Sequence, residues 1–214
     1  MPADRTPRGT ITVPGRGTVR IDPDVATIRL GVVVVRPTAA DARTAAASTM
    51  GSVIGALTGG GVERRDLRTT LVGLDAVRDY SSESGPRVTG YQLTNAVEAT
   101  IRAIEAVGAL IDAALAAGAT SMDGLSFQLA DPTAALDEAR RRAVTDARAR
   151  ATTLAAEAGV TLGSVIEIVE GGALPPGPPR PMAELRMKAA DVATPVEAGT
   201  SELEIGVTVG FAID

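Results

Sequence analysis

The order of apolar and polar positions predicts strands that alternate with helices along most of the chain. The clearest strand pattern is at the C-terminal end, where apolar residues occupy every second position over residues 203–213. This period of two is typical of a strand with one buried face. The same pattern predicts further strands over residues 10–21, 25–35, 67–80, 88–102, 125–129 and 165–169. Within the first of these, Pro14, Gly15 and Gly17 favour an edge position or a bulge.

Three other segments have the apolar spacing of helices. The first begins at Thr38, a predicted N-cap with Asp41 in capping-box position, and its inner face is predicted to contain Ala42, Ala46, Met50, Val53 and Leu57. The second covers residues 104–117 and ends at Gly118. The third begins after Asp131 and Pro132, ends at Gly159, and has a predicted inner stripe of Leu136, Ala139, Ala143, Ala147, Ala151, Leu154 and Ala158. An alanine-rich stripe allows a helix to approach a sheet closely.

Pairs of strands separated by helices predict an α+β fold: a two-layer sandwich with a mostly antiparallel sheet and helices packed on one face. We expect a flexible segment over residues 1–9 and a domain over residues 10–214. Within it we expect two interleaved halves, residues 10–87 with 200–214 and residues 88–170, and a proline-rich arm over residues 171–199. The length of 214 residues suits one large domain or two small ones that share a core.

The composition excludes much of the usual catalytic chemistry. The chain contains no His, no Cys and no Trp, so Ser-His and Cys-His nucleophile pairs cannot form. The preferred ligands of zinc, iron–sulfur and haem sites are missing too. Lys188 is the single Schiff-base candidate. We therefore expect no enzymatic activity and no cofactor.

Charge and hydropathy argue against nucleic acid and membrane as partners. The chain has 21 Lys and Arg against 26 Asp and Glu, a net charge of −5, and only two Tyr and two Phe. An acidic chain with few rings lacks both the phosphate contacts and the stacking platform that nucleic acid needs. The run Arg140-Arg141-Arg142 stands beside Asp137 and Glu138, which favours a solvated charged face or salt bridges between subunits. No apolar run approaches the length of a membrane span.

Two groups of carboxylates are candidates for a metal site or for acid–base chemistry. Asp22 and Asp24 flank Pro23, and Asp75 and Asp79 share one predicted strand. Paired carboxylates hold Mg²⁺ or Ca²⁺ or divide acid and base roles, but two at a turn are usually solvated turn formers. An enzyme that uses carboxylates alone is therefore an alternative hypothesis.

Two other motifs have a structural and a chemical interpretation. The segment Gly15-Arg16-Gly17 resembles part of a phosphate loop but lacks the full motif and a following helix, so an edge bulge is favoured. Tyr91 either packs in the core or lines a pocket, and core packing is favoured.

The proline-rich segment is the candidate contact surface. Polyproline is extended and loses little entropy when it docks. Contact with another subunit, plain disorder and contact with a different protein remain open alternatives. The residues that we expect at an oligomer or partner contact are Pro175, Pro176, Pro178, Pro179, Leu185 and Met187.

An ordered set of short segments over about Thr10 to Ile213 resembles the SIMPL-domain family. The matching segments are residues 11–17, 22–26 and 66–69, Gly90-Tyr91 with Asn95, residues 138–147, residues 158–163, and Pro195 with Gly199. The resemblance implies a two-layer α+β fold, large ring-like homo-oligomers and no established catalytic activity. It also implies an association of some bacterial relatives with oxidative stress.

The resemblance and the composition together predict a non-enzymatic, self-assembling protein, with a stress-related role implied by the family. A protein–protein adaptor is a second alternative beside the carboxylate enzyme. Many members of the family carry a secretion signal, and residues 1–10 lack the apolar core of one. We therefore expect a cytoplasmic location for the chain as written, and a periplasmic one if the true start lies upstream.

Overall fold

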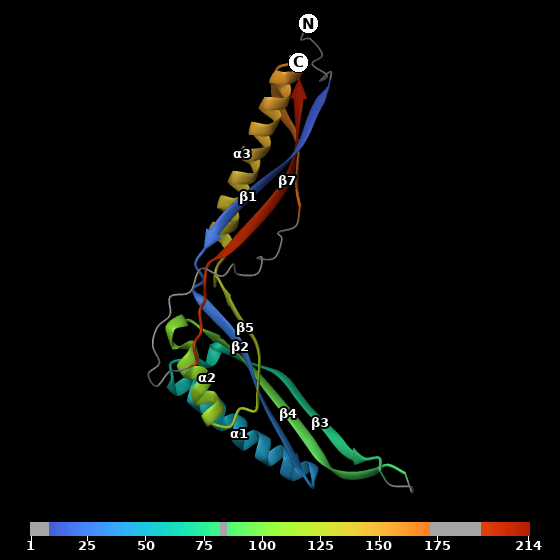
Figure 1. Ribbon diagram of the computed structural model, residues 1–214, viewed down its shortest axis with the longest axis vertical. Coiled ribbons are helices and arrows are strands. Elements are labelled where there is room, and N and C mark those ends of the chain that lie inside the picture. The colour runs from blue at the N-terminus through green and yellow to red at the C-terminus, as the bar shows by residue number, and fades with distance from the viewer. Residues whose placement is uncertain (1–8, 82–84, 172–193) are drawn as a thin grey trace. The chain divides into compact units, whose positions relative to one another are not determined.

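The computed structural model describes residues 9–81, 85–171 and 194–214. These residues form two compact units (Figure 1). Unit 1 contains the described residues among 1–22, 129–183 and 199–214, and unit 2 those among 23–128 and 184–198. The segment over residues 1–9 that is predicted to be flexible lies, except for Gly9, outside the described residues.

Unit 1 is a three-stranded antiparallel sheet with one helix across it. Its elements are β1 (Thr10–Ile21), α3 (Thr133–Ala158), β6 (Leu162–Glu170) and β7 (Ser201–Ile213), and the strand order is β1-β7-β6. The C-terminal strand therefore takes the central place, as its unbroken apolar period suggests. The predicted edge position of β1 is confirmed, but the predicted bulge is wrong because β1 pairs with β7 in continuous register.

The helix α3 packs so closely on β1 that its backbone occupies the space of two side chains on the strand. A Cβ at Gly15 would overlap the carbonyl oxygen of Ala143, and a Cβ at Gly17 would overlap that of Ala139. Only glycines on the strand opposite alanines on the helix permit this approach. The predicted close contact between an alanine stripe and a sheet is thus confirmed.

The inner stripe of α3 differs from the predicted one at its C-terminal end. Leu154 is half exposed and Ala158 is exposed, whereas Ala155 is buried and Leu136 only partly so. The fully buried residues repeat every four positions, as Ala139, Ala143, Ala147, Ala151 and Ala155. Because the helix packs closely on the strand, the small side chain of Ala155 is buried and the larger Leu154 beside it points to solvent. The helix ends at Gly159, whose φ of 69° is the left-handed conformation expected there.

Unit 2 is a four-stranded antiparallel sheet in the order β3-β4-β2-β5. Its strands are β2 (Val25–Arg36), β3 (Leu67–Asp79), β4 (Arg87–Ile101) and β5 (Ser121–Gln128). Two helices, α1 (Ala39–Gly59) and α2 (Val107–Ala116), cover one face, and the short turns η1 (Arg64–Asp66) and η2 (Ile104–Ala106) connect elements. The second predicted helix therefore begins as a 3₁₀ turn.

The inner face of α1 is the one that the spacing predicts. Its buried residues are Ala42, Ala46, Met50, Val53 and Leu57. The Thr38 hydroxyl oxygen accepts a hydrogen bond of 3.1 Å from the backbone N–H of Asp41 and donates one of 2.7 Å to the Asp41 carboxylate. These bonds confirm the predicted N-cap. The largest core of unit 2 joins α1 and α2 to the inner faces of β2 and β4.

The α+β class, with antiparallel strands and helices on one face, is confirmed, but the strands form two sheets. Residues 87 and 88, where the sequence pattern places a boundary between halves, fall in β4 beside its partner β3. The observed units instead divide near residues 22 and 128, between paired sets of strands. The division into two units follows from strands that pair over long sequence separations, and the local hydrophobic period does not indicate which strands pair.

We expect Gly17→Ala to lower the free energy of unfolding by about 3 kcal/mol, because the added methyl overlaps helix backbone that cannot rotate away. The measurement is denaturant unfolding followed by circular dichroism. Gly206→Ala in β7 is the matched control, since a Cβ there meets no atom within 4 Å. Equal stabilities of the two variants would contradict the close packing of α3 on β1.

Candidate functional site

The segment Gly15-Arg16-Gly17 is a packing surface and a strand edge. The face of β1 with its two glycines is filled by α3, and β1 leads into β2. On the opposite face, Arg16 pairs with Glu204 at 3.0 Å. A phosphate loop needs free backbone N–H groups at the start of a helix, so the geometry does not suit that interpretation.

A shallow depression of about 580 Å³ lies over β1 and β7 in unit 1. Its charged residues are Arg16, Arg150 and Glu204, and Thr208 contributes a hydroxyl. Arg16 is paired with Glu204, and Arg150 with Asp146 at 3.0 Å. Because each guanidinium already faces a carboxylate, the depression offers little charge to an anionic ligand.

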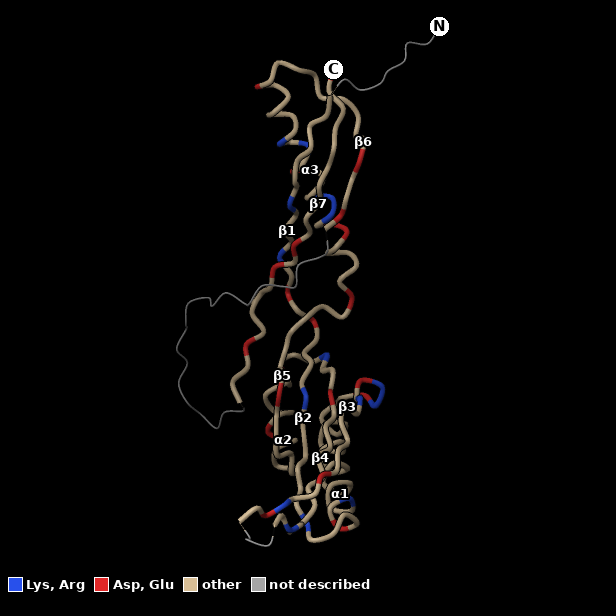
Figure 2. Tube along the Cα trace, turned by 90° about the vertical axis from the view of Figure 1, so that its right-hand side faces the viewer, with Lys and Arg blue, Asp and Glu red and all other residues tan. Residues whose placement is uncertain are grey.

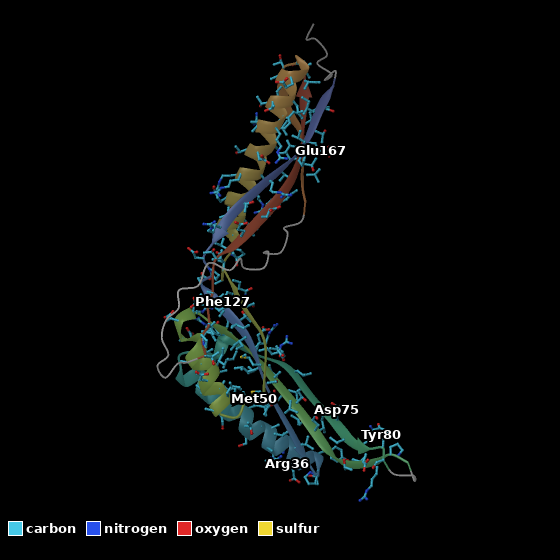
Figure 3. All side chains as sticks on the ribbon, in the orientation of Figure 1. Arg36, Met50, Asp75, Tyr80, Phe127 and Glu167 are labelled. Atoms are coloured by element: carbon cyan, nitrogen blue, oxygen red, sulfur yellow. The ribbon has the colours of Figure 1, made fainter. Side chains whose placement is uncertain are left out.

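The carboxylates of both predicted pairs, Asp22 with Asp24 and Asp75 with Asp79, lie at exposed positions. Asp75 and Asp79 are exposed on β3, where Figure 3 labels Asp75. The Ser81 hydroxyl and backbone N–H donate to Asp79 and lower the pKa of its carboxyl. Over residues 9–81, 85–171 and 194–214, no three His, Cys, Asp or Glu residues come together in a way that could hold a metal ion.

The three consecutive arginines of α3 are neutralised by neighbours. Arg140 pairs with Asp137 and Glu170, while Arg141 and Arg142 both pair with Glu138. The two guanidiniums beside Glu138, Arg142 first, lower the pKa of its carboxyl. Cationic and anionic residues are interspersed along the chain (Figure 2). This arrangement is the predicted charged face, in which each of the three guanidiniums is paired with a carboxylate.

Tyr91 is half buried against the small core of Ala42, Ala46 and Leu93. The favoured interpretation as a packing residue is confirmed. On the same strand, the Oδ1 atom of Asn95 is buried without a hydrogen-bond partner among the described groups.

Two strands expose aliphatic side chains that no helix covers. In unit 1, α3 lies over β1 and β7 and scarcely touches β6, which leaves Ile166, Ile168 and Val169 each about half exposed. In unit 2, α1 packs against β2 and β4, and the outer strand β3 exposes Leu71 by 50%, Val72 by 64% and Leu74 by 48%. Both strands lie at sheet edges, where unpaired backbone groups can bind another strand.

The exposed strands β3 and β6 are candidate surfaces that the sequence pattern does not identify, because periodicity shows which face of a strand is apolar and not whether a helix covers it. The usable signal was the run of aliphatic residues without Pro or Lys in residues 71–77 and 165–169.

The residues predicted at an oligomer contact, Pro175, Pro176, Pro178, Pro179, Leu185 and Met187, lie outside the described residues. The chain is described again from Thr194, whose backbone N–H and hydroxyl donate to the Asp112 carboxylate on α2 at 3.1 and 2.6 Å. Val196 packs against the core of unit 2. The C-terminal end of the predicted arm is thus attached to α2.

The described residues form a two-unit α+β protein in which the edge strands β3 and β6 are not covered by a helix. The model of the SIMPL family, described as a protein of unknown function (DUF541), matches residues 11–211. The chain therefore belongs to the SIMPL family, and the resemblance seen in the sequence is confirmed.

Two named relatives are periplasmic. The chain is 33% identical over 212 residues to the 26 kDa periplasmic immunogenic protein of Brucella melitensis, and equally so to that of Brucella abortus; the match covers 95% of this chain and 84% of each relative. It is 31% identical over 144 residues to the uncharacterized protein YggE of Escherichia coli, covering 66% of this chain and 58% of the relative.

The expected cytoplasmic location is contradicted by the Brucella relatives. Among the described helices, none has the length and apolar character required to cross a bilayer.

Two side chains of α3 bond to the backbone at the edge of β1, and one of them is a titratable carboxylate. The Asp146 carboxylate accepts the backbone N–H of Arg16 at 2.9 Å, and the Arg142 guanidinium donates to the carbonyl oxygen of Thr18 at 2.7 Å. The Arg16 N–H is the main cause of a lowered pKa for Asp146, and Arg150 adds to it. A lowered folded-state pKa stabilises the fold above the unfolded value and ceases to do so as pH falls through the folded value.

We expect Asp146→Asn to be less stable than the wild type at pH 7, with the difference shrinking as the pH falls below about 4. The free energy of unfolding of both proteins, measured from pH 7 to pH 3, tests this. Asp137→Asn is the control on the same helix, because its ion pair with Arg140 stays within α3. A stability difference that is independent of pH would show that Asp146 does not act through its charge.

Proposed function

We propose that this SIMPL-family protein has no catalytic activity and acts by assembling with copies of itself in the periplasm. The observation that supports the proposal most is the exposure of aliphatic side chains on the two uncovered edge strands, β3 and β6. An exposed aliphatic edge can pair with a further strand or pack against another apolar surface, and a protein with two such edges in different units has two surfaces for an assembly. The stress-related role implied by the family resemblance is part of the proposal.

The missing residue types support the non-catalytic part. Without His or Cys, the side chains left for proton transfer near neutral pH are carboxyl groups with raised pKa values, one lysine and two tyrosines. Among the described carboxyl groups, those with a resolved shift, Asp66, Asp79, Asp131, Glu138 and Asp146, all have lowered pKa values. A lowered pKa makes a carboxylate a weaker base.

The periplasmic part of the proposal rests on the Brucella relatives. Expression of the full-length gene in its own host, followed by osmotic release of the periplasm, is expected to recover the protein with a periplasmic marker enzyme. Recovery with a cytoplasmic marker would contradict this location.

For self-assembly we expect a particle mass that is a multiple of 21.7 kDa at micromolar concentration, measured by light scattering and by native mass spectrometry. The double variant Val72→Lys with Ile168→Lys is expected to lower the mass, because a charge on an edge strand opposes pairing. Thr12→Lys, on the exposed face of β1, is the control for added charge and should keep the wild-type mass. A wild-type protein that stays at 21.7 kDa over the whole concentration range would refute the proposal.

A further inference from the structure

The two described sheets have four outer strands, and they differ in how far they are open to another strand. The strand orders β1-β7-β6 and β3-β4-β2-β5 leave β1, β6, β3 and β5 at the edges. The edge of β1 is occupied by Asp146 and Arg142 of α3, which bond the Arg16 N–H and the Thr18 carbonyl. Pro14 removes one further donor from this strand. A second chain therefore finds little free backbone on β1.

The strands β5 and β6 are open but irregular. β5 has eight residues, its pairing with β2 shifts register between Thr27 and Arg29, and Gly124 has a φ of 63°. β6 shifts register against β7 twice, on either side of Val165, so that only its last four residues pair regularly. Bulges bend a strand and interrupt the ladder that a new neighbour would extend. Both strands are poor templates for long pairing.

The strand β3 is the one described edge that is long, regular and aliphatic. Residues Leu71 to Val77 pair with β4 in continuous register, and the shifts lie just outside, after Thr69 and after Val77. Three of its large apolar side chains are about half exposed or more: Leu71, Val72 and Leu74. The segment contains neither Pro nor Lys, the residues that usually protect an edge. It is thus a template of seven residues for a further strand.

The sequence of this edge is compatible with an antiparallel copy of itself in one register. If Leu74 lies opposite Leu74 of a second copy, then Val72 faces Ala76, Leu71 faces Val77, and Asp75 faces Gly73. In that register no charged residue faces one of like sign. A pairing centred on Asp75 sets two carboxylates directly opposite, and one centred on Gly73 sets Arg68 opposite Arg78. Like charges in direct opposition destabilise a strand pair, so the charges disfavour both of these registers. The register centred on Leu74 also places all seven regularly paired residues, Leu71 to Val77, opposite one another in the two copies, and a register centred on any other residue does not.

We infer that β3 is the contact through which two copies of this chain pair, antiparallel and two-fold symmetric about Leu74. The inference rests on the proposed self-assembly and assigns one of its surfaces. Residues i, i+2 and i+4 of a strand share one face, so Val72, Leu74 and Ala76 of both copies form a continuous apolar strip. This strip covers side chains that each copy alone leaves exposed. Each four-stranded sheet then continues into the sheet of its partner.

The missing cysteines make a direct test of this register possible, since any introduced Cys is the only thiol of its chain. Residues directly opposite in an antiparallel pair have Cα atoms about 4.5–5.5 Å apart, which is within disulfide range. Leu74→Cys is therefore expected to form a covalent dimer under mild oxidation. In Val72→Cys the two thiols are offset by four residues, about 13 Å along the strand, so no disulfide should form.

A mixed experiment adds a second readout of the same register. Gly73→Cys and Asp75→Cys should each stay monomeric on denaturing gels when oxidised alone and form a heterodimer when mixed. Both positions tolerate a new side chain, since a Cβ at Gly73 meets no atom within 4 Å and Asp75 is exposed. Circular dichroism and thermal melting of each variant check that the fold is retained.

The outcomes separate this inference from the proposed self-assembly. Cross-linking of Leu74→Cys but not of Val72→Cys supports the pairing. Cross-linking of Val72→Cys in place of Leu74→Cys overturns the register, and no cross-linking in a protein that is oligomeric by mass overturns the β3 contact while self-assembly stands. A wild-type protein that is monomeric by mass overturns both.

Discussion

The contact between α3 and β1 determines most of what unit 1 presents to its surroundings. Gly15 and Gly17 on the strand and the alanines on the helix allow the two backbones to touch. Such short side chains allow the helix to lie close to the sheet, but they do not extend to the neighbouring strand β6. The helix therefore covers the two strands beneath it, β1 and β7, and leaves β6 exposed. The small residues between α3 and β1 thus account both for the close packing of this helix and for the exposure of β6.

A comparable relation holds in unit 2 by itself. Ala42 and Ala46 begin the inner face of α1 and pack against Leu93 of β4, while the larger residues further along the helix fill the main core (Figure 3 labels Met50). The helices cover the two central strands, and β3 lies beyond them. Its apolar residues keep the alternating pattern of a core strand, but half of their surface faces solvent. Such exposure is costly in a monomer and is removed when another strand covers it.

Local features of this fold could be read from the sequence, and long-range ones could not. The inner face of α1 and the Thr38 cap follow from spacing and from one side chain, so they were predicted correctly. The predicted inner stripe of α3 includes Leu154 because the prediction used apolar character alone. Close packing of the helix on the sheet requires small side chains, so Ala155 is buried in its place. Which strands pair depends on residues over a hundred positions apart, as for Thr10 and Ala212, and the division into two sheets was therefore missed.

The candidate surfaces show the same limit. The apolar character of Val72 and Ile168 is plain in the sequence, but their exposure follows from where the helices end up. The arginine run was read correctly as a neutralised face because its partners Asp137 and Glu138 are neighbours along one helix. The contact residues chosen in the proline-rich segment lie outside the described residues, so that choice remains a prediction. The location is the one clear error of function, and the relatives, not the fold, correct it.

The number of open edges limits the size of any assembly. A two-fold contact at β3 uses the same surface on both copies, so by itself it stops at a dimer. Growth beyond a dimer needs a second surface that β3 pairing leaves free, and the strand β6 of unit 1 exposes three aliphatic side chains that suit this role. Its register shifts around Val165 restrict strand pairing there, whereas Ile166, Ile168 and Val169 can still pack side chain against side chain. A strong ladder contact at β3 and a packing contact at β6 would differ in strength, and dimers would then be the units from which larger particles form.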